Sequence, residues 1–325
     1  MLLLTIISWI VSIALKLFFF LVLLLVALIL GYRFFYEPVK GVCVCKRDLK
    51  GRTVLVTGGN SGIGLETARD LAKRGAKVII ACRDAKKSED AVTDIINSTQ
   101  NSKVKFKQLD LSKFESIRRF AKEFNETEER LDILVNNAGC AGVKKKPTED
   151  GIDTVMQVNY FGPFLLTHLL LDKLKASSPS RIVIVSSYAH VMARLNVEDL
   201  KGLKTKGYWT RYANSKLCNV LWAKALAKHL TNGVTANVLH PGVVKTDIFK
   251  RLPDVYRDIV LKIITLVFKT AKEGAQTTIH LCVAPELVNA TGGYYRDCKP
   301  EKVSSVVTEE LVDKVWEESL KIIQN

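Results

Sequence analysis

After one long apolar run, hydrophobic and polar positions along the chain follow two alternating patterns. From Asp48 onward, short runs rich in β-branched residues alternate with stretches in which apolar residues recur at helical spacing. Strands buried on both faces of a parallel sheet form such short runs, and amphipathic helices connect them. The pattern predicts an α/β domain, a doubly wound parallel sheet of about seven strands with helices on both faces. The expected strands cover residues 53–57, 77–82, 104–109, 131–135, 181–186 and 234–239, and the expected helices include residues 62–74, 112–124 and 211–230.

The apolar run at the N-terminus is a candidate membrane span. Residues 2–30 contain 22 Leu, Ile, Val or Phe residues and a single charge, Lys16. Each such apolar residue contributes roughly −0.3 to −0.6 kcal/mol to insertion, whereas a central Lys costs about 3 kcal/mol, so insertion remains favourable. A cleaved signal peptide fits less well, because the run is too long and lacks a basic region before it and a small-residue cleavage site after it. The sequence predicts a single-pass anchor (residues 1–31), a juxtamembrane linker (32–48) and one folded domain (49–325).

The charges beside this run indicate its orientation. None precedes Lys16, whereas several basic residues follow the run: Arg33, Lys40, Lys46, Arg47 and Lys50. The folded domain is therefore expected to face the cytosol, on the endoplasmic reticulum or a related intracellular membrane. Seven cysteines, an odd number without framework spacing, also fit a reducing compartment. The glycosylation sequons should accordingly stay unmodified; they are at Asn97, Asn125 and Asn289.

The composition narrows the classes of partner. The formal net charge is +15 and the isoelectric point about 9.4, which could favour nucleic acid, an anionic membrane surface or a phosphorylated ligand. Basic and acidic residues are interspersed, without a basic stripe interleaved with aromatic residues. We expect a lipid bilayer and a phosphorylated ligand as partners, and no nucleic acid. Cys43 and Cys45 are either acylation sites or ordinary thiols.

The first chemical motif directly follows the first expected strand and opens a helix. It reads Thr57-Gly58-Gly59-Asn60-Ser61-Gly62-Ile63-Gly64. A dinucleotide pyrophosphate needs a close backbone approach, which glycine permits, and free N–H groups at a helix N-terminus. A mere glycine-rich turn is the alternative, but this one lies within a βαβ unit of roughly 30 residues. It predicts a Rossmann-type site in which the cofactor contacts Gly58, Asn60, Ser61, Gly62, Ile63 and Gly64.

The end of the second expected strand indicates which cofactor is bound. It reads Ala81-Cys82-Arg83-Asp84, with no acidic residue closing the strand itself. An Asp or Glu there would bond the ribose hydroxyls of NAD, whereas the planar fork of an Arg accepts the 2′-phosphate of NADP. Arg83 therefore favours NADP(H). A different register could bring Asp84 to the ribose, which leaves NAD(H) as the alternative.

Tyr212 and Lys216 form the candidate reactive pair. They are four residues apart on an expected helix, so both side chains lie on one face. A free Tyr titrates near pH 10, and an adjacent ammonium should lower this pKa by favouring the phenolate. Ser187 closes an apolar strand at the sheet edge that faces ligands. Ser186 is its rival, but side chains alternate along a strand and Ser187 is favoured.

With these motifs assembled, the chain resembles the classical short-chain dehydrogenase/reductase family from Leu49 to about Arg296. Further segments agree in order: Asp110-Leu111, Asn136-Asn137-Ala138-Gly139, Asn159, Pro241-Gly242 and Thr246. The resemblance implies that Asp110 and Leu111 contact adenine, and that Asn137, Ala138 and Gly139 support the cofactor. It also implies that Pro241, Gly242, Val244 and Thr246 hold the nicotinamide. The implied catalytic set is Tyr212 for proton transfer, Lys216, Ser187 for the substrate oxygen, and Asn159 for a proton relay through water.

The substrate is indicated by weaker features. The 24 residues between Ser187 and Tyr212 exceed the usual family spacing, and with the N-terminal anchor they make the chain similar to the membrane-bound retinol dehydrogenase branch. Residues 249–270 carry an apolar stripe at helical spacing, which either contacts lipid or packs on the domain. A lipophilic alcohol or aldehyde is expected: retinoid first, then isoprenoid or fatty aldehyde, then steroid, with carbonyl reduction as the favoured direction. A homodimer is compatible with the resemblance, and a catalytically silent membrane scaffold is the non-enzymatic alternative.

Overall fold

The computed structural model describes residues 2–31, 41–231, 233–244 and 269–324, and it divides into an N-terminal helix and a folded domain. The helix α1 (Leu2–Gly31) contains a 27-residue apolar stretch, Thr5–Gly31, in which a window of 18 residues has a mean hydropathy of 3.1 and no buried side chains. By length and composition this stretch can cross a membrane. The predicted anchor is thus a continuous helix.

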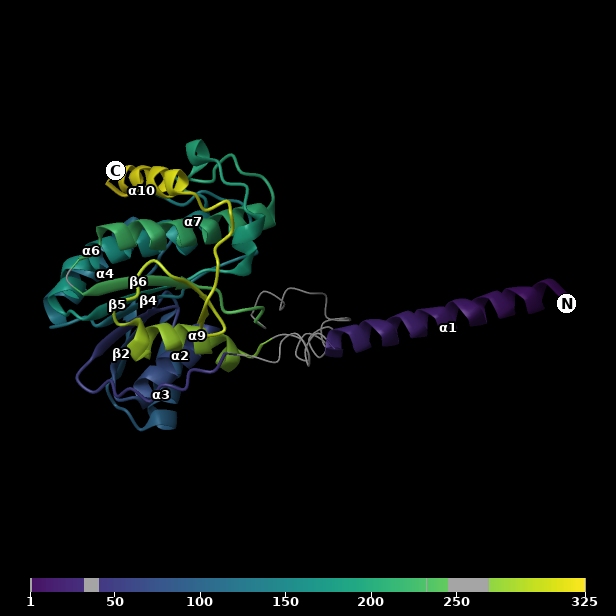
Figure 1. Ribbon diagram of the computed structural model, residues 1–325, viewed down its shortest axis with the longest axis horizontal. Helices are drawn as coiled ribbons and strands as arrows, with labels where there is room; N and C mark the ends of the chain where they lie inside the picture. Colours follow the sequence, from purple (N-terminus) through teal and green to yellow (C-terminus); the bar gives the residue numbers. More distant parts are fainter. Residues whose placement is uncertain (1, 32–40, 232, 245–268, 325) are drawn as a thin grey trace. The chain divides into compact units, whose positions relative to one another are not determined.

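The folded domain is built on one sheet, whose strands run in the order β3-β2-β1-β4-β5-β6-β7-β8 (Figure 1). All neighbouring pairs are parallel except β7 and β8. The chain winds outward from β1 to β3 and then returns to place β4 beside β1, which makes the β1–β4 boundary the topological switch point. The strands are β1 (Thr53–Thr57), β2 (Lys77–Cys82), β3 (Val104–Gln108), β4 (Ile133–Asn136), β5 (Ser180–Val185), β6 (Val234–Leu239), β7 (Tyr294–Arg296) and β8 (Lys299–Pro300).

Helices cover both faces of this sheet. Figure 1 shows α2 (Gly62–Lys73), α3 (Ala85–Thr99) and α9 (Ala271–Val283) on one face. The opposite face carries α4 (Phe114–Thr127), α6 (Gly162–Ala176) and α7 (Tyr208–His229), and α10 (Glu309–Gln324) packs outside α7. Alternation along the strands divides the core in two: Leu55 faces one set of helices, and its neighbours Val54 and Val56 face the other.

Short helical turns connect several of these elements, most of them near the carboxyl ends of the strands and the last at the opposite, amino-terminal edge. They are α5 (Thr154–Met156), the π-helical turn η2 (Gln157–Phe161), and the 3-10 turns η3 (Tyr188–Met192), η4 (Val197–Asp199) and η6 (Pro285–Leu287). The predicted doubly wound sheet is confirmed, and β1, β2 and β6 begin and end at the expected residues. The ends of β3, β4 and β5 differ from the expected ones by one or two residues, and β7 and β8 are too short to give a hydrophobic pattern.

The hairpin between β7 and β8 turns through Asp297 and Cys298, with φ angles of 49° and 59°. Two successive residues with positive φ are typical of a type I′ hairpin turn, which usually contains Asn and Gly. Here the side chain of Asp297 forms an ion pair with the buried Lys269. That pair holds the turn against the backbone of Val243, to which the Lys269 N–H donates at 2.9 Å.

Residues 41–49 pack on the folded domain as an extended segment whose side chains are alternately half-buried and exposed. The N–H of Cys43 donates to Gln276 Oε1 at 3.1 Å, and Arg74 Nη1 donates to the carbonyl of Cys45 at 2.6 Å. The thiol of Cys45 donates to the carbonyl of Val283 at 3.4 Å. The last of these contacts fits an unmodified thiol at Cys45 better than an acylated one.

Candidate active site

The motifs singled out in the sequence gather at the carboxyl edge of the parallel strands. This is the edge at which open α/β sheets bind ligands. Each of the first six strands is followed by one of the predicted site segments, represented by Gly58 after β1, Arg83 after β2, Asp110 after β3, Asn137 after β4, Ser187 after β5 and Pro241 after β6.

Glycines in the loop from β1 to α2 serve different purposes. Gly58 has a φ of +66°, a conformation that side chains other than glycine rarely adopt. A Cβ on Gly64 would lie 2.3 Å from the carbonyl oxygen of Gly58, so only glycine lets the helix pack this closely on the loop. A Cβ on Gly62 would meet nothing within 4 Å, which leaves the N-terminus of α2 open. The first N–H groups of a helix have no partners within it, so this end fits a pyrophosphate.

Asn137 ties the loop after β4 to the loop after β1. Its Nδ2 donates to the carbonyl of Thr57 at 3.0 Å. The backbone N–H groups of Asn137 and Ala138 donate to Thr57 Oγ1 at 3.0 and 3.1 Å. Asn136 instead points into the domain and donates to Thr167 Oγ1 at 2.9 Å. The two nucleotide-facing loops are thus braced against each other across the switch point.

The residues after β2 are the ones on which the two cofactor alternatives, NAD(H) and NADP(H), depend. Arg83 is exposed, and no ion pair of its side chain is found among the described residues. Asp84 is the N-cap of α3, and its Oδ1 accepts from the N–H of Lys87 at 3.0 Å. The carboxylate that could have bonded a ribose is therefore engaged in capping, whereas the guanidinium is available. Asn60 Nδ2 donates to Ser88 Oγ at 3.0 Å and fixes the glycine loop beside this helix.

Asp110 shapes its own loop after β3. Its Oδ1 accepts from the N–H and the hydroxyl of Ser112 at 2.9 and 2.6 Å. Its backbone N–H donates to Ser116 Oγ at 3.0 Å. Leu111 is buried in the core. The predicted contacts of Asp110 and Leu111 with adenine stay predictions.

Tyr212 and Lys216 lie one turn apart on α7, next to the end of β5. Lys216 Nζ donates to the carbonyl of Val185 at 3.0 Å and lies 5.7 Å from the centre of the Tyr212 ring. The Ser187 hydroxyl lies near enough to the Tyr212 phenol to act on its pKa, which it lowers. The buried Ser186 points elsewhere and donates to the carbonyl of Lys216 at 2.7 Å. Ser187, and not Ser186, is thus brought to Tyr212.

Burial shifts the pKa values of both Lys216 and Tyr212. It lowers the pKa of Lys216 from 10.5 to about 8. It also raises the pKa of Tyr212 above 10.0, although the nearby Ser187 hydroxyl acts in the opposite direction. Desolvation dominates this shift, so the net pKa of Tyr212 is raised, whereas the neighbouring ammonium led us to expect a lowered one. The effect of Lys216 itself on the phenol stays a prediction. A Cβ on Gly139 would lie 3.5 Å from both Lys216 Nζ and Asn159 Oδ1, so these side chains converge on the loop after β4.

Asn159 joins that loop to the helix that carries Tyr212. It lies buried in the π-helical turn η2. Its Oδ1 accepts from the N–H of Cys140 at 2.7 Å, and its Nδ2 donates to the Cys140 carbonyl and to Ser215 Oγ, both at 3.0 Å. Ser215 Oγ donates to the carbonyl of Tyr212 at 2.7 Å. These bonds make Asn159 a brace, and its predicted relay through water stays a prediction.

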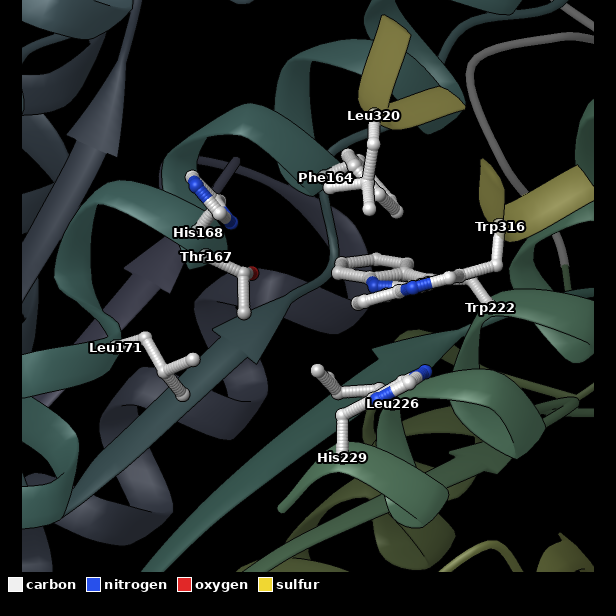
Figure 2. Close-up of a pocket in the computed structure, with 9 residues that line it drawn as sticks. All are labelled: Phe164, Thr167, His168, Leu171, Trp222, Leu226, His229, Trp316 and Leu320. Atoms are coloured by element: carbon white, nitrogen blue, oxygen red, sulfur yellow. The ribbon is translucent and has the colours of Figure 1, made fainter. Parts of the chain in front are cut away.

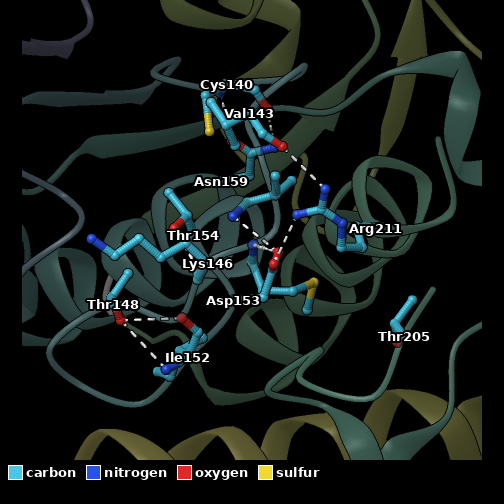
Figure 3. A network of polar contacts seen from close by, with 12 residues as sticks. Cys140, Val143, Lys146, Thr148, Ile152, Asp153, Thr154, Asn159, Thr205 and Arg211 are labelled. Atoms are coloured by element: carbon cyan, nitrogen blue, oxygen red, sulfur yellow. Dashed lines mark hydrogen bonds and ion pairs between the residues drawn. The ribbon is translucent and has the colours of Figure 1, made fainter. Parts of the chain in front are cut away.

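Arg211, directly before Tyr212, is a residue that the sequence patterns did not single out. Its Nη1 donates to Asp153 Oδ2 at 2.8 Å, and the two side chains are 5% and 0% exposed. Its Nη2 donates to the carbonyl of Val143 at 3.1 Å, and Asp153 also accepts from the N–H of Val155. Figure 3 shows Arg211 reaching both partners. The buried pair thus fixes the start of α7 against the loop after β4.

The segment after β6 approaches the glycine loop from the other side. A Cβ on Gly274 would lie 2.6 Å from Val244 and 3.3 Å from Ile63, so both side chains pack against this glycine of α9. Gly242 has a φ of +84°, and its N–H donates to His240 Nδ1 at 3.1 Å. Val244 therefore lies near the glycine loop, and the predicted contact of this segment with the nicotinamide stays a prediction. Thr246 and residues 249–268 of the apolar stripe lie outside the described residues.

A separate apolar cavity of about 320 Å³ lies between α6, α7 and α10 (Figure 2). Trp222 and Trp316 line it, and the ring of Trp316 stacks on His229 at 4.7 Å. None of the predicted site residues lines this cavity. One of its lining residues, Thr167, accepts the hydrogen bond from Asn136.

Comparisons with known proteins agree with this geometry. The sequence model described as short chain dehydrogenase matches residues 52–256. Retinol dehydrogenase 12 of Mus musculus is 42% identical over 285 residues, covering 87% of this chain and 90% of that protein. Retinol dehydrogenase 13 of Mus musculus is 44% identical over 292 residues, covering 87% of each. A crystal structure of an uncharacterized protein from Mycobacterium Paratuberculosis superposes with a TM-score of 0.70 at 31% identity, covering 86% of this chain and 95% of that one. A short chain dehydrogenase from Escherichia coli CFT073, complexed with NADPH, gives 0.60 at 25% identity, covering 78% and 99%.

Proposed function

Because the chain belongs to the short chain dehydrogenase family, we propose that it is an NADP(H)-dependent oxidoreductase that interconverts a lipophilic alcohol and its aldehyde or ketone, retinol and retinal first. The observation that carries the proposal is the cluster formed by Ser187, Tyr212 and Lys216 at the carboxyl edge of the sheet, the edge at which the open N-terminus of α2 also lies. A nicotinamide cofactor fits this edge, because the glycines leave room for its phosphates and the buried lysine lies beside the tyrosine.

When bound, the cofactor supplies or accepts the hydride. Tyr212 then transfers a proton to or from the substrate oxygen. Ser187 Oγ accepts from the N–H of Ala189 at 3.2 Å, so its own proton remains available for the substrate oxygen or the tyrosine. Lys216 would contact the cofactor ribose and hold its positive charge beside the phenol. Since burial raises the pKa of Tyr212, the phenol is protonated at neutral pH and is prepared to act as an acid. Carbonyl reduction is the direction that we propose, and it is the one for which the phenol already carries the proton to be given.

The preference for NADP(H) is supported by the residues after β2. The carboxylate of Asp84 caps α3, and the exposed Arg83 is the side chain whose fork suits a 2′-phosphate. A preference for retinoids is supported by the names of the retinol dehydrogenases that the chain resembles along most of its length. The apolar helix α1 supports attachment to an intracellular membrane. The basic residues after α1 support a domain that faces the cytosol.

The test uses the full-length protein in lipid nanodiscs with NADPH. Retinal, farnesal, a long-chain aldehyde and a steroid ketone are compared by NADPH consumption, and retinal is expected to give the highest kcat/KM. Replacing Tyr212→Phe should reduce turnover by about 10²–10⁴-fold, the usual contribution of a proton-transfer group. NADPH binding, measured by fluorescence, should persist. Tyr208→Phe on the same helix is the matched control and should keep wild-type turnover.

Two results would contradict the proposal. Wild-type turnover in Tyr212→Phe would remove the tyrosine from the mechanism. Absence of NADPH consumption with every compound of the panel would favour the non-enzymatic scaffold.

A further inference from the structure

Large apolar side chains are unevenly distributed over the surface of the folded domain. Outside α1, eleven of them are exposed among the described residues. Six of the eleven lie on the three segments that flank the Ser187–Tyr212 pair, and we call these six the apolar rim: Tyr188, Val191, Met192, Tyr208, Trp209 and Val243. Single exposed apolar residues are normal on a protein surface, but a group gathered around one site indicates an interaction surface.

The contacts of the rim tie it to the catalytic pair. The rings of Trp209 and Tyr212 are 6.5 Å apart at 81°, and those of Tyr208 and Trp209 are 5.3 Å apart. Tyr188 directly follows Ser187 in the turn η3. Trp209 and Met192 are 61% and 62% exposed. The rim thus borders the position at which the substrate oxygen must arrive.

The segments of the rim are held in place by polar contacts below them. Asn214 of α7 accepts from the N–H of Arg194 at 2.8 Å, and its Nδ2 donates to the Arg194 carbonyl at 3.2 Å. Asp199 accepts from the N–H of Lys204 and from the hydroxyl of Thr205. Hydrogen bonds from Asn214 and Asp199 therefore hold the backbone of the loop between η3 and α7, while its apolar and basic side chains are exposed.

Basic side chains accompany the apolar ones. Arg194, Lys204 and Lys206 lie on the same loop, are exposed, and form no ion pair among the described residues. Glu198 is the exposed acidic residue of this loop, since Asp199 is engaged internally. Trp and Tyr favour the interface between lipid and water, and Lys and Arg are attracted to anionic headgroups. This combination of side chains suits a membrane surface.

We propose that the apolar rim inserts into the headgroup region of an anionic bilayer, so that the catalytic site opens onto lipid. The proposal rests on the proposed function, which requires a substrate dissolved in the membrane. Insertion buries the rim and spares the substrate a passage through water. The basic side chains around the rim fix the face that the domain presents. An amphipathic surface of this kind binds through buried apolar area together with electrostatic attraction.

The first experiment measures insertion without using activity. Full-length protein is reconstituted in vesicles of phosphatidylcholine and phosphatidylserine whose acyl chains are brominated near the headgroup, and tryptophan quenching is recorded. We expect bromine to quench Trp209. The amount of fluorescence removed by brominated lipid should therefore be smaller in Trp209→Phe than in the wild type, and it should be unchanged in the matched control Trp316→Phe. Vesicles of phosphatidylcholine alone should quench Trp209 less. Equal quenching of the wild type and Trp209→Phe overturns the proposal. Because Trp9 of α1 reports separately on the anchor, loss of all quenching overturns both the anchor and the rim.

The second experiment measures the consequence for catalysis. In Met192→Ser, which replaces a rim residue without a ring contact to Tyr212 among the described residues, the apparent KM for a long-chain aldehyde in vesicles should rise about tenfold, the factor that corresponds to one lost apolar anchor. The kcat, and the KM for a short water-soluble aldehyde, should stay unchanged. If the KM for the long-chain aldehyde rises equally in detergent and Trp209 is not quenched by lipid, the rim is only a substrate-binding wall and the bilayer contact is refuted. Absence of activity in the wild type would refute the proposed function, while the quenching result would still decide the rim.

Discussion

Replacing Lys216→Met should separate two effects of this lysine: its contribution to catalytic activity, and the amount by which its buried charge lowers the free energy of unfolding. Burial lowers the pKa of Lys216 from 10.5 to about 8, and a difference of this size corresponds to about 3 kcal/mol in the free energy of unfolding at pH 7. The folded state binds this proton more weakly than the unfolded state. The cost is therefore fully present below about pH 8 and disappears as the pH rises through 10.5. Methionine fills a similar volume without charge and should remove this cost.

The assay is urea unfolding of both proteins in detergent, without added NADPH, between pH 7 and pH 10. The variant should be more stable relative to the wild type at pH 7, and by pH 10 the charge cost should shrink to about 1 kcal/mol or less. The lost hydrogen bond to the Val185 carbonyl adds only a constant, because Asn219 Nδ2 also donates to that oxygen at 3.3 Å. The variant should be inactive at every pH. A stability difference that does not change with pH would refute the reasoning.

Three further replacements test the cofactor site, the buried ion pair and the two serines. Arg83→Glu should raise the KM for NADPH by about tenfold or more and leave the KM for NADH little changed, because a charge-assisted bond to the 2′-phosphate is lost; equal effects on both cofactors would contradict this. Arg211→Met should lower the free energy of unfolding by about 3–5 kcal/mol, because it leaves Asp153 charged and buried, whereas Arg211→Lys should lower it less; urea unfolding distinguishes them. Ser187→Ala should reduce kcat/KM by about a hundredfold with little change in stability. Ser186→Ala should cost about 1 kcal/mol in stability and spare kcat, and the reverse pattern would exchange their roles.

Features with a local signature could be predicted from the sequence. The spacing of the glycines after β1 predicts a dinucleotide-binding loop, because the turn, the pyrophosphate and the helix contact each require glycine at a fixed position. Tyr212 and Lys216 could be paired because a helix places residues four apart on one face. Ser187 could be separated from Ser186 by the alternation of a strand.

Features that depend on distant residues could not be predicted. Asp153 and Arg211 are 58 residues apart, and no local pattern relates them. The raised pKa of Tyr212 follows from burial by several elements together, whereas the sequence displays only the neighbouring lysine. The hairpin of β7 and β8 is built on a turn whose residues, Asp297 and Cys298, are unusual for their conformation.

Cys140 lies in the loop that Asn159 braces, close to the charge of Lys216. Burial raises the pKa of this thiol to about 11, so at neutral pH only about one thiol in ten thousand is ionised. The thiolate is the form that attacks electrophiles, and the aldehydes of the proposed reaction are electrophiles. The packing that buries this loop therefore also protects the proposed enzyme chemically, because it keeps a sulfur beside the catalytic lysine unreactive toward the compounds that pass it.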